Sequence, residues 1–198
     1  MKLKPRAILF DLDGVLVDSF DAWLAALNDA LKTFNYKELT KDEFINRYWG
    51  HDLFDNIKKM DLTYEVGDAC NKFYKNHIDK IKIFPNTKDV LLKLNNYRKG
   101  LITNTPKDST IRVLKQFYIY RYFELVLTSN DVKFSKPNPE IVLKSCKLLN
   151  LEPNEAILVG DTKSDVEAGK SAGCKVIGIN VKADYTVENI SEIINLLI

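Results

Sequence analysis

The feature that most constrains the fold is a regular alternation between short apolar runs and segments with helical periodicity. Residues 7–10 are wholly apolar and end in acidic and glycine residues, as is typical of a strand buried on both faces of a parallel sheet. Because helical segments separate the runs, we predict βαβ units in a doubly wound, Rossmann-like α/β fold of about five main parallel strands with right-handed crossovers. The further apolar runs are 101–102, 125–127, 157–159 and 176–179, and the helical segments are 90–94, 111–117, 141–149 and 164–172.

Residues 19–81 break this alternation, because they show only helical periodicity. An all-helical insertion is therefore expected after the first strand of the core. A chain of 198 residues has room for one α/β core with a small accessory domain. The predicted division is a catalytic core of residues 1–16 and 82–198 and a helical cap of residues 17–81. The helices predicted within the cap cover about 20–34, 44–48, 53–60 and 66–81.

Charge and cysteine usage narrow the class of protein. Lysine and arginine total 29 against 27 acidic residues, and the basic residues are scattered, so we expect no nucleic-acid partner. The three cysteines are far apart and show no metal-binding spacing, which argues against a disulfide framework. No apolar run approaches the roughly 18 to 20 residues of a membrane span, and residues 1–6 lead into a strand without a signal-peptide apolar region. A cytoplasmic protein without a membrane partner is expected.

Helix starts lie next to polar residues at the strand ends. We predict N-cap residues at Thr105 and Asn138, each followed by proline, and at Ser164, which is followed three residues later by glutamate. In an open α/β sheet ligands bind at this edge, and helix N-termini favour anions. The sequence therefore predicts an anion site at the carboxyl ends of the strands.

Side chains at the same edge supply the groups that hydrolysis of a phosphate ester requires: a nucleophile, a proton donor and positive charge. Three carboxylates that converge from separate strand ends would repel one another unless a cation lay between them, and an all-oxygen site suits Mg²⁺. Magnesium is therefore the predicted cofactor. The groups are Asp11 with Asp13, Thr103 with Asn104, Lys136, and Asp161 with Asp165.

Segments 11–19, 101–104, 135–137 and 160–165 resemble, in order, the four signature motifs of the haloacid dehalogenase superfamily, and they span nearly the whole chain. The helical insertion that follows the first motif is similar to the cap of the phosphoglycolate phosphatase and β-phosphoglucomutase branch. The resemblance implies that Asp11 attacks phosphorus and becomes an aspartyl phosphate. It implies that Asp13 protonates the leaving alcohol and later activates water. Members that break carbon–halogen bonds lack an aspartate at the Asp13 position, so this residue favours phosphate esters.

The same resemblance implies the ligands of metal and phosphate. Mg²⁺ would be held by the Asp11 carboxylate, the Asp13 backbone carbonyl and Asp161, with Asp165 ligating directly or through water. The phosphoryl oxygens would be bound by Thr103 and the amide of Asn104, with Lys136 neutralising the charge.

Residues of the predicted cap are candidates for substrate contact. Arg47 and His51 flank Gly50, where a loop could face the catalytic edge. Trp23 and His77 fall on apolar helical stripes, so we expect core residues there instead of ligands.

The predicted function is Mg²⁺-dependent hydrolysis of a small phosphorylated metabolite, such as phosphoglycolate or a sugar phosphate, by a monomer or weak homodimer. The alternatives are a β-phosphoglucomutase-like phosphomutase and a binding protein of the same fold without turnover. Trp23 occupies the position where the mutase caps carry a histidine, and Leu53 falls near an expected arginine, which disfavours the mutase.

Overall fold

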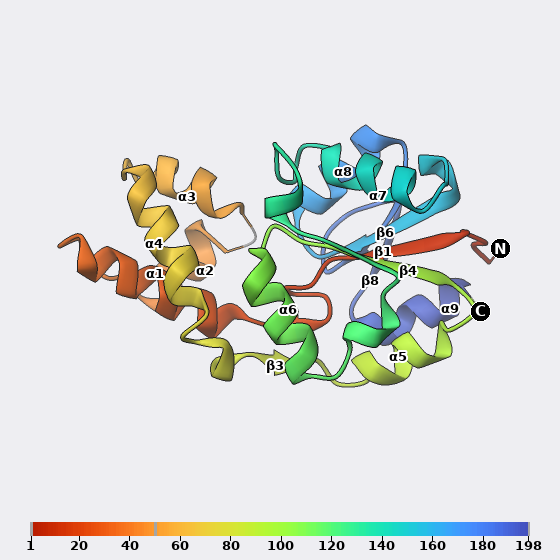
Figure 1. Cartoon of the computed structure of the whole chain (residues 1–198), viewed down its shortest axis with the longest axis horizontal. Helices are drawn as coiled ribbons and strands as arrows, with labels where there is room; N and C mark the ends of the chain where they lie inside the picture. The colour runs from red at the N-terminus through yellow and green to blue at the C-terminus, as the bar shows by residue number, and fades with distance from the viewer. Residues whose placement is uncertain (1, 50, 198) are drawn as a thin grey trace.

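The computed structural model describes residues 2–49 and 51–197 and contains a six-stranded parallel sheet at its centre (Figure 1). Counted along the chain, its strands lie in the order third, second, first, fourth, fifth, sixth, which is the doubly wound arrangement. The predicted α/β fold class is confirmed. The strands in spatial order are β5 (Leu125–Leu127), β4 (Arg98–Ile102), β1 (Ala7–Phe10), β6 (Ala156–Gly160), β7 (Lys175–Ile179) and β8 (Tyr185–Val187).

The central strand β1 is buried on both faces, because helices cover both sides of the sheet. Ile8 and Phe10 belong to one apolar cluster, and Ala7 and Leu9 belong to another, as the alternation of side chains along a strand requires. The first cluster contains residues of α5, α6 and α9, and the second contains residues of α7 and α8 (Figure 1). These helices are α5 (Thr87–Lys93), α6 (Lys107–Gln116), α7 (Glu140–Leu148), α8 (Lys163–Ala172) and α9 (Ile193–Leu197).

The sixth strand, β8, was absent from the predicted set of main strands. It pairs in parallel with β7 at the edge of the sheet. It has three residues, of which Val187 is buried and Thr186 is exposed. Such a short segment lacks the continuous apolar run by which the buried strands were found.

The capping box predicted at Ser164 lies two residues earlier in the chain. The Asp165 N–H donates to the Thr162 hydroxyl at 3.3 Å, and the Thr162 N–H donates to the Asp165 carboxylate at 3.1 Å. The Ser164 prediction is wrong because Thr162 is also followed three residues later by an acid, and α8 begins directly after Thr162.

Two other helices begin one residue later than predicted. Pro106 occupies the N-cap position of α6, so Thr105 is free for another contact. Pro139 occupies the N-cap position of α7. Asn138 Oδ1 nevertheless accepts a hydrogen bond from the Glu140 N–H at 3.0 Å, so the Asn138 side chain satisfies one of the unpaired donors at this helix start.

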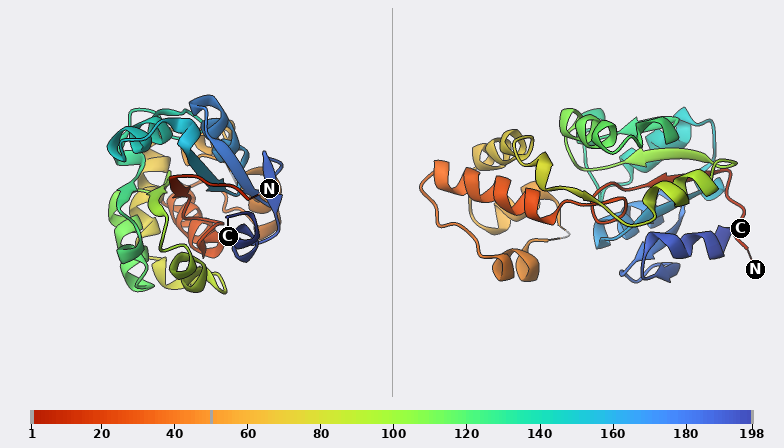
Figure 2. Two further views of the ribbon diagram at one scale, coloured as in Figure 1. Left: turned by 90° about the vertical axis from the view of Figure 1, so that its right-hand side faces the viewer. Right: turned by 90° about the horizontal axis from the view of Figure 1, so that it is seen from below.

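Residues 19–81, here called the helical insertion, lie beyond the carboxyl ends of the core strands, opposite the two chain termini (Figures 1 and 2). The chain enters through β2 and returns through β3, which pair antiparallel with Val17 opposite Ile83. The last predicted helix ends at Tyr74, earlier than its apolar pattern suggested, and a short 3₁₀ turn follows. The division into core and cap stays a prediction. The elements are β2 (Val17–Asp18), α1 (Phe20–Thr33), α2 (Lys41–Arg47), α3 (Leu53–Lys59), α4 (Tyr64–Tyr74), η1 (Ile78–Lys80) and β3 (Lys82–Ile83).

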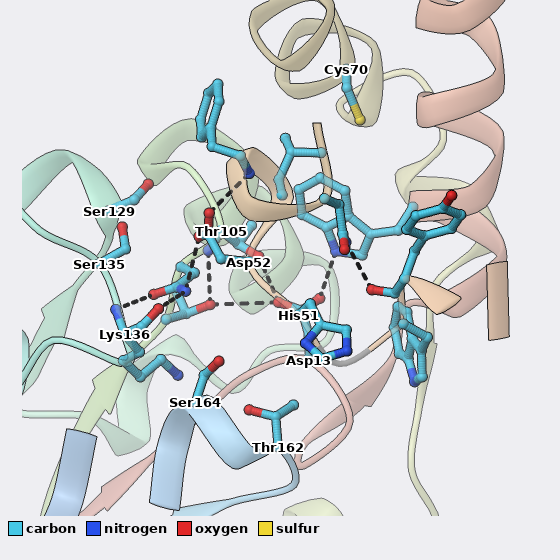
Figure 3. A pocket seen from close by; sticks show the side chains of 18 of the residues that line it. Asp13, His51, Asp52, Cys70, Thr105, Ser129, Ser135, Lys136, Thr162 and Ser164 are labelled. Carbon is cyan, nitrogen blue, oxygen red and sulfur yellow. Dashed lines mark hydrogen bonds between the residues drawn. The ribbon is translucent and has the colours of Figure 1, made fainter. Parts of the chain in front are cut away.

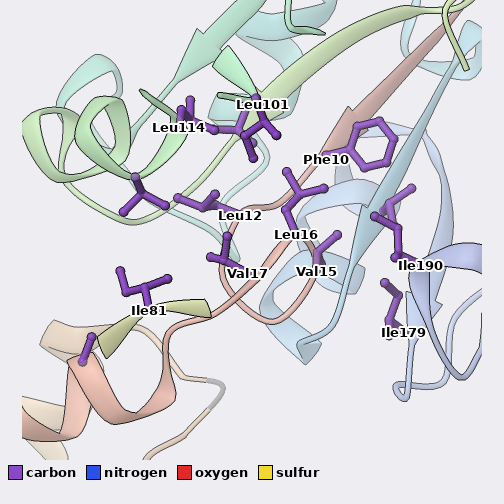
Figure 4. Packing of buried hydrophobic residues seen from close by; sticks show 14 of the residues in the cluster. Phe10, Leu12, Val15, Leu16, Val17, Ile81, Leu101, Leu114, Ile179 and Ile190 are labelled. Carbon is purple, nitrogen blue, oxygen red and sulfur yellow. The ribbon is translucent and has the colours of Figure 1, made fainter. Parts of the chain in front are cut away.

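One apolar cluster continues from the core into the helical insertion (Figure 4). Leu12, Leu16 and Val17 of the loop after β1 pack in the same cluster as Ile81, which precedes β3. All four side chains are buried. Their burial anchors the loop on which the first motif lies.

The helices in the described part of the chain lack the length and apolar character that a membrane crossing requires. The three cysteines are free and buried.

Candidate active site

The loop after β1 brings its backbone unusually close to the loop after β6. Within it, the Gly14 N–H donates to the Val17 carbonyl oxygen at 2.8 Å. Gly14 has φ +75°, and a Cβ at this position would lie 1.9 Å from Asp161 Oδ2. Glycine is therefore required here both by the left-handed backbone and by the approach of the Asp161 carboxylate.

Asp11, Asp161 and Asp165 meet at the carboxyl edge of the sheet, although they come from three different elements. One oxygen of each lies within 4.8 Å of the others. Asp11 is 6% exposed and Asp165 is fully buried. Burial raises the pKa of Asp11 to about 7 against the opposing effect of Lys136, and burial with the neighbouring carboxylates raises the pKa of Asp161 well above its ordinary value.

This trio fits a hard divalent cation. Asp161 Oδ1 is buried and has no hydrogen-bond partner among residues 2–49 and 51–197. An unpartnered, buried carboxylate oxygen beside two further carboxylates is costly unless a cation satisfies it. Oxygen ligands of this kind are those that Mg²⁺ prefers. The Asp13 carboxylate lies outside the trio.

Lys136 inserts a positive charge between two of these carboxylates. Its Nζ lies 2.9 Å from Asp11 Oδ1 and donates to Asp165 Oδ1 at 2.6 Å, and the residue is 3% exposed. Burial alone would lower the pKa of the Lys136 ammonium, but Asp11 and Asp165 raise it above its ordinary value. Lys136 is therefore a fixed cation directly beside Asp11.

Hydroxyl groups of Thr103 and Thr105 in the core and of Ser19 at the start of the helical insertion contact the Asp13 carboxylate. Thr105 Oγ1 donates to Asp13 Oδ2 at 2.6 Å, and Thr103 Oγ1 lies 3.5 Å from the same oxygen. Ser19 Oγ donates to Asp13 Oδ1 at 2.5 Å. Thr105 was expected only as a helix cap, so its contact with Asp13 was missed.

Two aromatic residues of the helical insertion also reach Asp13. The Trp23 indole N–H donates to Asp13 Oδ1 at 3.3 Å, and the Tyr74 hydroxyl donates to it at 3.2 Å. Burial raises the pKa of Tyr74 well above its ordinary value, which keeps this hydroxyl protonated. The rings of Trp23 and Tyr74 stack with centroids 4.0 Å apart. Trp23 packs against the apolar core as predicted, but its indole also lines the cavity and contacts Asp13, which the sequence did not indicate.

The Asn104 side chain holds the loop that carries Lys136 in place by hydrogen bonds to its backbone. Asn104 Nδ2 donates to the Lys136 carbonyl oxygen at 2.9 Å, and the Lys136 N–H donates to Asn104 Oδ1 at 3.0 Å. Asn104 Nδ2 also donates to Asp52 Oδ2 in the helical insertion at 3.2 Å. Since these bonds engage its side chain, the backbone amide of Asn104 is the group suited to a phosphoryl oxygen.

The predicted core residues Asp11, Asp13, Thr103, Asn104, Lys136 and Asp161 all line one cavity of about 140 Å³, and Asp165 contacts Lys136 behind it. The cavity lies between the edge of the sheet and the helical insertion. Figure 3 shows Cys70 of the insertion at the top and Thr162 and Ser164 of the core at the bottom. Residues of the helical insertion that line it include Trp23, Phe44, Tyr48, Trp49, His51, Asp52 and Phe54.

The two candidate substrate contacts from the insertion differ in position. His51 lines the cavity and is exposed. Arg47 is exposed and is not among the described residues that line the cavity. Gly50, between them, lies outside the described residues. Asp52, which directly follows His51, was not predicted, although an aspartate before a helical pattern is the signal of an N-cap.

The fold and the site define an α/β enzyme with an acidic, cation-competent pocket at the carboxyl ends of its central strands. Residues 8–179 match the haloacid dehalogenase-like hydrolase family, and the chain belongs to this family. The family predicted from the four motifs is thereby confirmed.

Similar proteins cover nearly the whole chain. A putative pyrophosphatase PpaX of Clostridium perfringens is 31% identical over 209 residues, with 97% of each chain covered. A phosphoglycolate phosphatase of Aquifex aeolicus is 30% identical, with 97% of this chain and 96% of that one covered. The crystal structure of a haloacid dehalogenase superfamily hydrolase of subfamily IA from Geobacter sulfurreducens has a TM-score of 0.82 at 27% identity, and the match covers 98% of this chain and 100% of that chain.

Proposed function

We propose that this protein is a Mg²⁺-dependent phosphatase that hydrolyses a small phosphate monoester through an aspartyl phosphate on Asp11. The observation that carries the proposal is the contact of Lys136 Nζ with Asp11 Oδ1 at 2.9 Å, in a buried pocket that also contains Asp13 and Asp161. Relatives named pyrophosphatase and phosphoglycolate phosphatase support cleavage of a bond to phosphorus.

The phosphoryl group is bound next to Lys136. The Thr103 hydroxyl and the backbone amide of Asn104 donate to phosphoryl oxygens, and the Lys136 ammonium offsets their charge. Asp11, Asp161 and Asp165, with the backbone carbonyl of Asp13, are the groups that would hold Mg²⁺. When bound there, Mg²⁺ supplies positive charge that lowers the repulsion between an anionic nucleophile and an anionic substrate.

Hydrolysis proceeds in two displacements at phosphorus. In the first, an Asp11 carboxylate oxygen forms a bond to phosphorus while the bond from phosphorus to the alcohol oxygen breaks, and protonated Asp13 gives its proton to the leaving alkoxide. In the second, water attacks phosphorus and gives a proton to Asp13. The bond from Asp11 to phosphorus breaks, which releases inorganic phosphate and restores both carboxyl groups to their starting states.

Ser19, Thr105, Trp23 and Tyr74 hold the Asp13 carboxyl group by hydrogen bonds. We assign these four the role of positioning residues, because they act through Asp13. Trp23 and Tyr74 belong to helices of the insertion. The position of Asp13, the proposed acid and base, therefore depends on where the insertion lies relative to the core.

The test is release of inorganic phosphate from a panel of metabolite phosphates, with and without Mg²⁺, by the native protein and by Asp11→Asn. We expect Mg²⁺-dependent release by the native protein and a loss of at least about 1,000-fold in Asp11→Asn, since an amide cannot act as the nucleophile. Circular dichroism confirms that the variant is folded. Tight ligand binding without phosphate release would favour a binding protein, and isomerisation of a hexose phosphate without net release would favour a phosphomutase.

A further inference from the structure

The wall that the helical insertion contributes to the cavity is aromatic. Five rings line this side: Trp23, Phe44, Tyr48, Trp49 and Phe54. Trp49 packs edge-on against Phe44 with centroids 5.8 Å apart, so part of the wall is held by its own contacts. Aromatic faces attract apolar groups and cations, and they offer nothing to an anion.

Positive charge is scarce in the described lining of this cavity, and the further lysines nearby, Lys133 and Lys170, line a second cavity that Asp52 also borders. Among the described residues that line it, Lys136 is the only lysine or arginine, and its ammonium is already committed to Asp11 and Asp165. On the side of the insertion, His51 is the one lining group in the described chain that becomes cationic on protonation. Lys59 lies 5.6 Å from the centre of the Tyr48 ring, but it donates to a backbone carbonyl and is outside the described lining.

The insertion adds a carboxylate, Asp52, to this wall. Asp52 Oδ1 accepts hydrogen bonds from the N–H groups of Phe54 and Asp55 at 2.9 and 3.3 Å, which caps α3. Asp52 Oδ2 accepts one bond, from Asn104 Nδ2 at 3.2 Å. A carboxylate oxygen accepts about two hydrogen bonds, so Oδ2 has capacity for a further donor. Burial raises the pKa of Asp52, as expected for a carboxylate that lacks a cationic partner.

Asp52 is close to the phosphoryl site. The Asn104 side chain that bonds Asp52 also bonds the backbone of Lys136, whose Nζ lies 2.9 Å from the Asp11 carboxylate. Both Asp52 and Lys136 are labelled among the side chains that line the pocket in Figure 3. A substrate with its phosphorus next to Asp11 would therefore extend its leaving group towards the wall of the insertion, which contains the rings and Asp52.

We propose that the substrate is a phosphate monoester of an amino alcohol, whose ammonium group pairs with Asp52 against the aromatic wall. This inference rests on the proposed phosphatase function and names its substrate class. A carboxylate or a second phosphate on the leaving group would face Asp52 in a cavity whose described lining offers no lysine or arginine besides Lys136. An ammonium gains a charge-assisted hydrogen bond and the attraction of the rings. Phosphoglycolate and pyrophosphate are therefore poor substrates of this chain.

The test compares two substrates of similar length that differ in charge at the same end, phosphoethanolamine and phosphoglycolate. 4-Nitrophenyl phosphate, with an uncharged aromatic leaving group, serves as the reference, and pyrophosphate is measured alongside. We expect kcat/KM to be at least about ten-fold higher for phosphoethanolamine than for phosphoglycolate, the size expected for one favourable and one unfavourable charge contact at a partly buried site. A preference for phosphoglycolate or pyrophosphate would overturn the inference.

The variant Asp52→Asn tests whether this side chain causes the substrate preference. It preserves the helix cap, because asparagine is an equally good N-cap residue. The ratio of kcat/KM for phosphoethanolamine over phosphoglycolate should fall about ten-fold in Asp52→Asn. The control Asp42→Asn removes the same charge from an exposed residue of α2 that does not line the cavity, and it should leave the ratio unchanged. An unchanged ratio in Asp52→Asn contradicts the role of Asp52.

The outcomes separate the inference from the proposed function. If 4-nitrophenyl phosphate is hydrolysed in a reaction that Asp11→Asn abolishes, but phosphoglycolate is the better metabolite, the inference alone fails. If none of the four phosphates is hydrolysed, the proposed function fails and the inference fails with it.

Discussion

The two walls of the cavity differ in almost every physical property. The core wall contains Asp11 and Lys136, which are at most 6% exposed and form an ion pair, and buried Asp165 supports Lys136 from behind. The wall from the helical insertion contains rings, all but Phe44 partly exposed, and among its described residues one carboxylate, Asp52. The core wall provides the groups for phosphoryl transfer, which are the same for any phosphate ester. In the proposed mechanism the insertion wall meets the leaving group, so it would determine which ester is accepted. Changes in the core should therefore affect all substrates equally, and changes in the insertion should alter their ratio.

The largest effect is expected for Lys136→Met. Asp11 and Asp165 would be left as buried carboxylates without their cation, which costs about 3–5 kcal/mol in the free energy of unfolding. kcat should fall by at least about 100-fold for every substrate, because a preorganised charge at the phosphoryl group is lost. Urea denaturation and phosphate release measure the two effects. The exposed Lys133→Met serves as the control and should change stability by less than about 0.5 kcal/mol. A loss confined to one substrate would contradict the division between the walls.

Gly14→Ala tests how closely the loops after β1 and β6 approach. The new Cβ would lie 1.9 Å from Asp161 Oδ2 on a backbone with φ +75°, so the Asp161 carboxylate must move. We expect Mg²⁺ affinity to fall by about 10- to 100-fold, as for other changes that displace a metal ligand. Isothermal titration calorimetry measures this affinity without reference to turnover. Equal affinity in both proteins would show that Asp161 is not a ligand.

The response of stability to Mg²⁺ should depend on pH. The pKa of Asp11 is raised from 3.8 to about 7, so the metal-free native state holds a proton on this group that the unfolded chain loses near pH 4. The contribution of Asp11 to stability is therefore fully present below about pH 4 and is lost as the pH rises towards 7. Mg²⁺ requires the deprotonated carboxylates, so it should raise Tm more at pH 8 than at pH 5.5. A larger increase at pH 5.5 would contradict a metal site made of these groups.

The smallest effect is expected for Trp23→Phe. Phenylalanine retains a ring to stack on Tyr74 but removes the indole N–H that donates to Asp13 at 3.3 Å. Loss of one hydrogen bond of this length corresponds to a decrease in kcat of about three- to ten-fold, with little change in KM. Because Trp23 acts through Asp13, the pH dependence of kcat should shift as well. A change in KM alone, with an unaltered pH profile, would make Trp23 a packing residue of the insertion wall.

The aspartates, Thr103 and Asn104 could be predicted because each pair follows a short apolar run, whereas Lys136 was predicted from the motif of residues 135–137. The parallel topology then brings the carboxyl ends of β1, β4 and β6 to one edge, so residues far apart in the chain become neighbours. The start of α8 was misplaced because two overlapping cap patterns occur within a few residues. Strand β8 was missed because its pairing, not its composition, makes it a strand.

The residues of the insertion wall were harder to predict. Helical periodicity shows that Trp23 lies on an apolar stripe, but that stripe borders both the interior of the insertion and the active site. Which end of the stripe reaches Asp13 depends on how α1 and α4 pack together. Asp52 was equally hard to predict. Its sequence signal is that of a helix cap, and its contact with Asn104 joins two residues that are 52 positions apart in the chain.

The pairing of β2 with β3 affects how proteins of this family can acquire different insertions. Because Asp18 and Lys82 are opposite each other, at the few ångströms that separate paired strands, the insertion leaves the core and rejoins it at one place. A two-residue turn between these strands would join them as a hairpin separate from the core sheet. The whole insertion can thus be exchanged by recombination at two positions that are adjacent in space, and the residues at the strand ends are inherited unchanged.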